Sequence, residues 1–230
     1  MEILSIIPVR GGSKGIPGKN IKPLCGKPLV AYTIEASLAS KYISRTVVST
    51  EDKKIKDVAL YYGAEVIDRP MELAQDTIKT APVMLQVLDA LKSQGYTPDI
   101  TVLLQATCPL RTAGDIDTAF ELFFSKEDCD SVFSVTDRGC THALWRKEYN
   151  GEYTCLYDYR NRPRRQDTDK HFKLYCENGA IYIVKTDVML KVKDFIGEKP
   201  ELFVMPPCID IDEPADFERV EEILKAGNSN

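Results

Sequence analysis

The segment Ile3-Leu-Ser-Ile-Ile-Pro8, followed after Val9 by Arg10-Gly-Gly-Ser-Lys-Gly-Ile-Pro-Gly-Lys-Asn20, decides the fold. Its first six residues are a short apolar run, which predicts a buried strand. The glycine- and lysine-rich residues after it predict a loop at the carboxyl end of that strand. In an open α/β sheet, ligands bind outside the carboxyl ends of the strands. The loop is therefore a candidate binding site.

Outward from this segment, apolar runs that predict strands alternate with helical patterns. Further strands are predicted at 45–49, 64–67, 100–105, 131–136, 180–185 and 202–206. Helices are predicted at 28–40, 52–62, 79–94, 114–125 and 214–226. Strands separated by helices need crossover connections. The pattern therefore predicts an α/β fold, a Rossmann-like three-layer sandwich with a mostly parallel sheet and helices on both faces.

Length and composition fit one domain over residues 1–230. The net charge of −5 argues against general nucleic-acid binding, because such proteins present a basic surface. The N-terminus lacks a basic segment before its apolar run, and no stretch approaches the roughly 20 apolar residues that span a bilayer. Seven cysteines form no CxxC pair, which favours reduced thiols over a disulfide or zinc framework. We therefore expect a cytoplasmic protein that binds neither membrane nor nucleic acid.

The loop after the first strand has the composition of an anion-binding site. Its four glycines allow a tight turn with backbone N–H groups pointing inward, and Arg10, Lys14 and Lys19 supply positive charge. Residues 3–34 contain five Lys or Arg and no Asp or Glu, although the chain is acidic overall. The spacing matches neither a Walker A loop nor G-x-G-x-x-G. The pattern favours a polyphosphate site, and the alternative is a solvated basic loop.

A pair of carboxylates follows the last predicted strand, in Cys208-Ile-Asp210-Ile-Asp212-Glu-Pro214. In extended backbone, Asp210 and Asp212 lie on one face. Mg²⁺ is commonly held by one or two carboxylates together with phosphate oxygens and water. The alternative is that Asp212 caps the next helix and Asp210 is a solvated turn residue. Together with the basic loop, the pair favours Mg²⁺-dependent phosphoryl or nucleotidyl transfer.

Four segments, in this order and at these distances, resemble one family. They are Arg10–Asn20, Leu104-Gln-Ala-Thr-Cys-Pro-Leu-Arg111, Asn178-Gly-Ala-Ile-Tyr-Ile183 and Asp210-Ile-Asp212. Over about residues 3–225 the chain resembles the acylneuraminate cytidylyltransferases, also called CMP-sialic acid synthetases, in their nonulosonic-acid branch. The resemblance implies an enzyme that joins CMP from CTP to a 2-keto nonulosonic acid and releases pyrophosphate.

The resemblance also implies roles for individual residues. Nucleotide binding is implied for Arg10, Gly11, Gly12, Ser13, Lys14, Lys19, Asn20, Arg69 and Thr80. Contact with the acceptor sugar is implied for Gln105, Arg165 and Gln166, and Mg²⁺ binding for Asp210 and Asp212. Arg10, Lys19 and Asp212 would be catalytic, by positioning and charge neutralisation in a direct in-line displacement. The residues single out no general base.

Residues 138–175 interrupt the alternation, because they are rich in Arg, Tyr, Asp and Asn and show no clear helix. We expect an insertion within the domain. The resemblance implies that it is an arm of a homodimer that reaches the partner's active site. His142 and His171 lie in this insertion, and the proposed chemistry needs neither. Outside it, Arg69 either lines the nucleotide pocket or pairs with its neighbour Asp68.

Two further points stay open at this stage. Arg111 is as consistent with an internal ion pair or cap as with a substrate contact. Ala106 and Cys108 stand where the family commonly has Pro and Ser, and Ile78 and Lys79 replace small residues, so the acceptor is sialic, legionaminic or pseudaminic acid or a related sugar.

Other functions use similar parts. They are a cytidylyltransferase for an octulosonate or methylerythritol phosphate, a metal-dependent nucleotide-sugar glycosyltransferase and a nucleotide-sensing domain without catalysis. The first resembles this chain less in the basic loop. The second shares Asp-x-Asp but releases no pyrophosphate, and the third would bind nucleotide without turnover.

Overall fold

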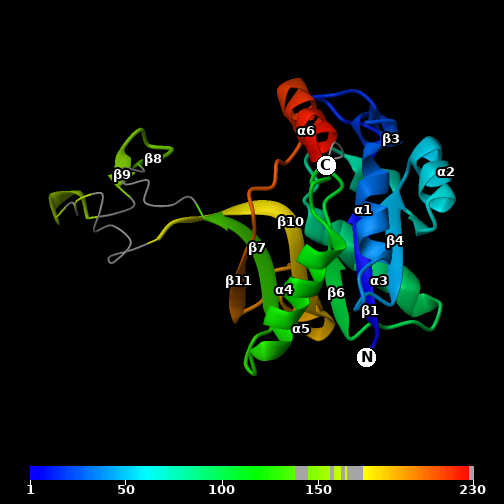
Figure 1. Cartoon of the computed structure of the whole chain (residues 1–230). Coiled ribbons are helices and arrows are strands. Elements are labelled where there is room, and N and C mark those ends of the chain that lie inside the picture. The colour runs from blue at the N-terminus through cyan, green and yellow to red at the C-terminus, as the bar shows by residue number, and fades with distance from the viewer. Residues whose placement is uncertain (138–144, 156–157, 162–163, 165–172, 228–230) are drawn as a thin grey trace.

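A seven-stranded sheet forms the centre of the computed structural model, which describes residues 1–137, 145–155, 158–161, 164 and 173–227 (Figure 1). The strands are β1 (Ile3–Pro8), β4 (Arg45–Thr50), β5 (Glu65–Asp68), β6 (Ile100–Leu103), β7 (Ser131–Asp137), β10 (Tyr175–Lys185) and β11 (Pro200–Val204). Their order across the sheet is β11-β7-β10-β6-β1-β4-β5. β10 runs antiparallel to both of its neighbours, and the other pairs in the sheet are parallel. The predicted mostly parallel sheet is confirmed.

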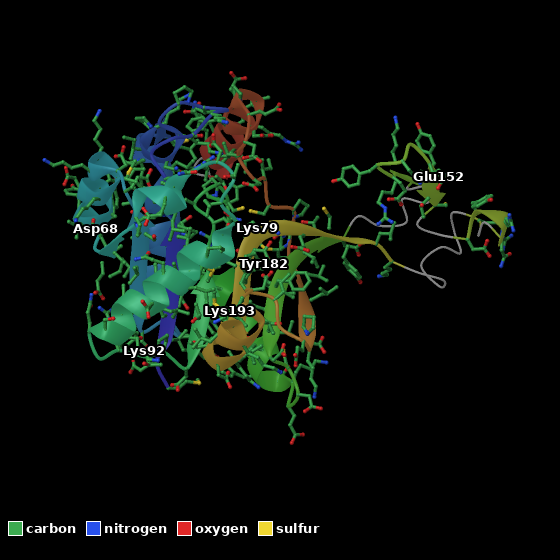
Figure 2. All side chains as sticks on the ribbon, turned by 180° about the vertical axis from the view of Figure 1, so that it is seen from behind. Asp68, Lys79, Lys92, Glu152, Tyr182 and Lys193 are labelled. Atoms are coloured by element: carbon green, nitrogen blue, oxygen red, sulfur yellow. The ribbon has the colours of Figure 1, made fainter. Side chains whose placement is uncertain are left out.

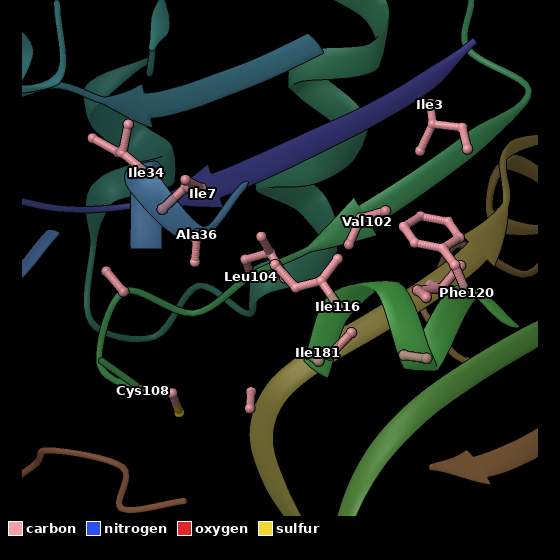
Figure 3. Close-up of a cluster of buried hydrophobic side chains, with 14 of the residues drawn as sticks. Ile3, Ile7, Ile34, Ala36, Val102, Leu104, Cys108, Ile116, Phe120 and Ile181 are labelled. Atoms are coloured by element: carbon pink, nitrogen blue, oxygen red, sulfur yellow. The ribbon is translucent and has the colours of Figure 1, made fainter. Parts of the chain in front are cut away.

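Helices cover both faces of this sheet. They are α1 (Leu29–Leu38), α2 (Lys53–Tyr61), α3 (Thr80–Ser93), α4 (Ala113–Ser125), α5 (Thr186–Val192) and α6 (Pro214–Gly227). One apolar cluster joins the sheet to α1, α2 and α4, and part of it is shown in Figure 3. A second cluster joins the opposite face to α3 and α5. The molecule is therefore the expected three-layer sandwich.

The first strand is apolar throughout because both of its faces are buried. Ile3 and Ile7 belong to the cluster beneath α1, α2 and α4, whereas Leu4 and Ile6 belong to the cluster beneath α3 and α5. Position in the middle of the sheet, between β6 and β4, accounts for this burial. As a result, the loop that follows β1 starts from the rigid centre of the molecule.

The chain after β1 and the C-terminal helix lie side by side at the top of Figure 1. Ile16 and Leu24 pack with Phe217 and Val220 of α6 in a third apolar cluster. Short elements that the sequence did not predict shape this region: a 3-10 turn at Lys19–Ile21 (η1) and the two-residue strands β2 (Pro23–Leu24) and β3 (Lys27–Pro28). Their packing fixes the basic loop against the C-terminal segment.

The described part of the predicted insertion lies well away from the sheet in Figure 1, as Glu152 does in Figure 2. It contains the antiparallel pair β8 (Trp145–Lys147) and β9 (Tyr153–Cys155) and a 3-10 turn, η3 (Tyr159–Asn161). The predicted acceptor contacts Arg165 and Gln166, and both histidines, lie outside the described residues.

Two general properties follow from the described residues. None of their helices combines the length and apolar character needed to cross a membrane. The cysteines among them are all free thiols: Cys25, Cys108, Cys129, Cys155, Cys176 and Cys208.

Candidate active site

A cavity of about 300 Å³ opens at the carboxyl ends of the parallel strands. Its walls come from the chain after β1, the segments after β5 and β6, the start of α3, and the loop between β11 and α6. The predicted site residues that line it are Arg10, Ser13, Lys19, Asn20, Arg69, Thr80, Gln105, Asp210 and Asp212. Residues far apart in the sequence therefore meet at the edge where an α/β sheet binds its ligands.

Lys19 joins the basic loop to the carboxylate pair. Its Nζ lies 3.2 Å from Oδ1 of Asp212 and donates a hydrogen bond to the carbonyl of Ile211. The residue is only 7% exposed. Gly18 precedes it in the left-handed conformation, with φ of 64°, and begins the η1 turn that directs Lys19 inward. A buried cation thus contacts the acidic loop directly at the edge of the cavity.

Gly15 brings the same two segments into close contact. A Cβ atom at this position would collide with the backbone carbonyl of Asp212. Glycine is therefore required for close approach rather than for an unusual backbone angle. The sequence showed four glycines in this loop. Only the structure shows that Gly15 is the one in contact with the loop that carries Asp210 and Asp212, called the carboxylate loop below.

Asp76 is a partner of the basic loop that the sequence did not reveal. Its Oδ1 accepts a hydrogen bond of 2.6 Å from Nη1 of Arg10, and its Oδ2 forms an ion pair with Lys14. Hydrogen bonding from Lys14, and secondarily from Arg10, holds the pKa of Asp76 below its usual value. Asp76 therefore pairs with both Arg10 and Lys14, the two cations that the sequence analysis assigned to the triphosphate.

The remaining loop residues have different surroundings. The N–H of Gly11 donates to Oε1 of Glu51 at 2.7 Å. Gly11, Gly12 and Lys14 are not among the residues that border the cavity. Asn20 is buried, and its Nδ2 donates to the carbonyl of Arg10 at 3.0 Å. The Asn20 contact holds the start of the loop in a fixed shape.

Arg69 lies in the cavity wall, and its guanidinium does not pair with Asp68. Its Nη2 and Nε donate to the carbonyl and the hydroxyl of Ser49, at 2.7 and 3.3 Å. Asp68 pairs instead with Lys56 at 2.8 Å. Burial lowers the pKa of Arg69. Arg69 therefore lines the cavity and is not the partner of Asp68, and nucleotide binding by it stays a prediction.

The carboxylate loop is held in place by its backbone. The N–H of Ile211 donates to the carbonyl of Thr107 at 2.9 Å, which ties this loop to the segment after β6. Oδ2 of Asp216 accepts the N–H groups of Asp212 and Glu213 at 3.1 and 2.9 Å. Asp216, not Asp212, thus accepts the N–H groups before α6. The side chain of Asp212 stays directed at Lys19.

The two aspartates have the chemistry of a magnesium site that is completed by other ligands. Desolvation raises the pKa of Asp210, and the nearby charge of Asp212 raises it further. A cation between the two carboxylates would relieve this repulsion. Among the described residues, no group of three or more His, Cys, Asp or Glu could hold a metal ion. Two carboxylates can bind Mg²⁺ where phosphate oxygens and water supply its remaining ligands.

Arg111 has a structural position. It is 2% exposed, and its Nη1 donates to the carbonyls of Gln105 and Ala180 at 3.2 and 2.8 Å. Burial lowers the pKa of Arg111. It borders neither this cavity nor a second one next to it that residues of β10 line. Arg111 is therefore an internal residue whose partners are backbone carbonyls rather than an acid, and it supports the backbone of Gln105.

Comparisons with known proteins agree with this geometry. The cytidylyltransferase family matches residues 4–223, and the chain belongs to that family. It is 34% identical to the CMP-N,N'-diacetyllegionaminic acid synthase of Legionella pneumophila, over 98% of this chain and 97% of that protein. It is 35% identical to N-acylneuraminate cytidylyltransferase A of Danio rerio, over 98% of this chain and 52% of that protein. The expected resemblance and the expected class of enzyme, a nucleotidyltransferase, are confirmed.

A solved structure shows the same fold. The structure of CMP:2-keto-3-deoxy-manno-octonic acid synthetase complexed with CTP superimposes with a TM-score of 0.75. The match covers 99% of this chain and 100% of that one at 15% identity. It confirms the arrangement of strands and helices around the cavity.

Proposed function

We propose that this protein transfers CMP from CTP to a nine-carbon 2-keto sugar acid and releases pyrophosphate. The observation that carries the proposal is the 3.2 Å approach of Lys19 to Asp212 in a cavity that Arg10 and Asp210 also line. Positive groups that can grip phosphate and carboxylates that can hold Mg²⁺ therefore share one space. A triphosphate with its metal needs both kinds of group within reach of one cavity.

In this proposal the triphosphate lies between the basic loop and the carboxylate loop. Arg10 and Lys14 now share Asp76, and they would exchange that single carboxylate for the larger charge of the phosphates. Lys19, a buried residue of the basic loop that contacts the carboxylate loop, would neutralise charge on the leaving group. Arg69 and Thr80 would form the wall against the nucleoside.

Asp210 and Asp212 would hold Mg²⁺, which supplies charge neutralisation at the phosphate oxygens. The protein's own part is positioning. The direct route needs no covalent enzyme intermediate: the anomeric hydroxyl of the acceptor loses its proton to water, and its oxygen forms a bond to the α-phosphorus. The bond from that phosphorus to the bridging oxygen breaks, and pyrophosphate leaves with the bond's electrons. Gln105, which borders this cavity and also a second one lined by residues of β10, would orient the acceptor.

A nine-carbon acceptor is favoured over the alternatives. The curated relatives named above act, by their names, on a legionaminic acid and on acylneuraminates, at 34% and 35% identity. The octonic acid synthetase matches at 15% identity, which supports the fold alone.

We also propose a cytoplasmic homodimer. The described part of the insertion exposes large aromatic side chains away from the sheet, including Trp145 at 48% and Tyr153 at 64%. Such exposure favours contact with another protein surface. Free thiols throughout the described residues fit a reducing compartment.

A pyrophosphate-release assay tests the proposal. CTP, UTP, ATP and GTP are each combined with sialic, legionaminic, pseudaminic and octulosonic acids, with and without Mg²⁺. We expect release that requires CTP, a nine-carbon acid and the metal, and that EDTA abolishes without unfolding the protein. Release with the octulosonate and with none of the nine-carbon acids would contradict the proposed acceptor. Release from another nucleotide would contradict the use of CTP, and release in the presence of EDTA would contradict the need for a metal.

A further inference from the structure

A second cavity adjoins the first and shares two of its residues. It has a volume of about 580 Å³, and Gln105 and Asp210 border both spaces. Its other walls come from β10 and the segment before α6, which contribute Asn178, Tyr182 and Pro207. A molecule here would lie beside the carboxylate that we assign to the metal. This placement suits the acceptor, since its hydroxyl must reach the nucleotide.

Negative side chains line this second cavity, and they would repel an acidic ligand. Asp210 and Glu177 both contribute carboxylates to its walls. Oε2 of Glu177 accepts a hydrogen bond from the hydroxyl of Tyr182 at 3.2 Å, which fixes it in place. A sugar acid brings a third negative charge. When Asp210 holds Mg²⁺, the carboxylate of Glu177 still opposes this charge, and a cation on the cavity wall would offset that repulsion.

Arg219 of α6 is the one cation among the described residues that line this second cavity. Within the described part of the chain, it makes no hydrogen bond or ion pair, and its side chain is exposed. The other basic residue of α6, Lys225, differs from it because it pairs with Glu221 at 3.1 Å. Arg219 therefore keeps all its donors available at the mouth of the cavity.

The location of Arg219 is also fixed. Val220, the next residue, is fully buried in the apolar cluster that holds α6 on the basic loop. Asp216, three residues before Arg219, anchors the N–H groups of the carboxylate loop. The helix that carries Arg219 is thus tied to the loop that carries Asp210.

We propose that Arg219 binds the carboxylate of the sugar acid in the second cavity and so selects acidic acceptors. This inference rests on the proposed function and adds a residue to it. A planar guanidinium matches a carboxylate with two parallel hydrogen bonds, which a neutral ester cannot accept in the same way. Arg165, which the family resemblance assigns to the same carboxylate, lies outside the described residues.

The test compares an acceptor with its own methyl ester. The acceptor identified in the pyrophosphate-release assay and its methyl ester are assayed with the full-length wild type, Arg219→Ala, Arg219→Lys and Arg165→Ala. For Arg219→Ala we expect KM for the acid to rise about tenfold, with KM for CTP unchanged, because one charge-assisted contact is lost. The preference for acid over ester, measured as kcat/KM, should fall by a similar factor. Arg219→Lys should recover part of it.

Lys225→Ala is the matched control, since it removes a positive charge from the same helix outside both cavities. It should keep the wild-type preference. An unchanged acid-over-ester preference in Arg219→Ala would overturn the inference, as would a loss of preference confined to Arg165→Ala. Both outcomes leave the proposed function standing. That function fails separately if the wild type releases no pyrophosphate from CTP with any acceptor.

Discussion

At the scale of single residues, the site depends on contacts between distant parts of the chain. Lys19 and Asp212 are 193 positions apart in the sequence and 3.2 Å apart in the structure. The sequence predicted both, because each belongs to a motif with its own chemical logic. Asp76 and Gly15 could not be predicted in their roles. Nothing near Asp76 marks it as a partner of Arg10, 66 positions away, and the importance of Gly15 appears only once Asp212 lies against it.

Removing either member of the central ion pair should slow the reaction. Lys19→Ala and Asp212→Asn should each lower kcat at least tenfold, which is about 1.4 kcal/mol of activation free energy. The measurement is turnover at saturating CTP, acceptor and Mg²⁺, with circular dichroism to verify folding. Lys54→Ala, an exposed lysine of α2, serves as the control. Near-normal kcat in well-folded variants would exclude these roles.

Gly15→Ala tests the close approach of the two loops. The added methyl group should displace the backbone of Asp212 and lower kcat/KM about tenfold, while the thermal midpoint changes little because the site lies at a loop. Gly114→Ala in α4 is the matched substitution, since a Cβ there meets its nearest neighbour at an ordinary 3.6 Å. Equal kinetics in the two variants would show that the loops adjust freely.

At the scale of elements, apolar runs located the strands of the sheet well because buried parallel strands are apolar on both faces. β1 has its predicted bounds, and β6 and β7 lie within two residues of theirs. The direction of β10 could not be predicted, because side-chain periodicity is the same for parallel and antiparallel strands. β10 also begins at Tyr175, five residues before the predicted 180, in a polar stretch that carries no apolar pattern. α5 was missed because its seven residues are too few to show a helical period.

The ion pair between β4 and β5 gives a pH-dependent prediction. Arg45 donates two hydrogen bonds of 2.6 Å to Glu65, and the bonding lowers the pKa of Glu65. A lowered folded-state pKa adds stability above the unfolded pKa, and this is lost as pH falls through the folded value. The Glu65 side chain is 51% exposed, so the contribution is that of a surface pair.

Glu65→Gln should therefore lower the free energy of unfolding at neutral pH by roughly 0.2–1 kcal/mol. The difference from wild type should shrink as the pH is taken below about 4.3, the ordinary pKa of glutamate. Urea unfolding between neutral and acidic pH measures it, with Glu222→Gln on α6 as the control. If the difference in the free energy of unfolding between wild type and Glu65→Gln grew as the pH fell, the lowered pKa of Glu65 would be contradicted.

At the scale of the whole molecule, the described aromatic residues of the insertion lie outside the packed body. We expect the protein to have twice the mass of one chain by light scattering after size exclusion. The double variant Trp145→Asp/Tyr153→Asp should shift toward the mass of one chain, because charges in an apolar contact are costly to desolvate. Tyr61→Asp is the control, since Tyr61 is 84% exposed on α2 in the body. A double variant that stays dimeric would place the contact elsewhere.

The insertion begins and ends on two neighbouring strands of the sheet, β7 and β10, so it can be exchanged as one segment. β7 and β10 are antiparallel neighbours, with Asp137 opposite Tyr175 and Val132 opposite Ile183. The chain therefore departs and returns at adjacent points, and the pairing below those points does not depend on how many residues lie between them. Residues 138–174 can be treated as an exchangeable cassette. With the proposed dimer contact in this insertion, grafting the corresponding stretch from a relative should change which chains pair, while the sheet and its cavity keep their own residues.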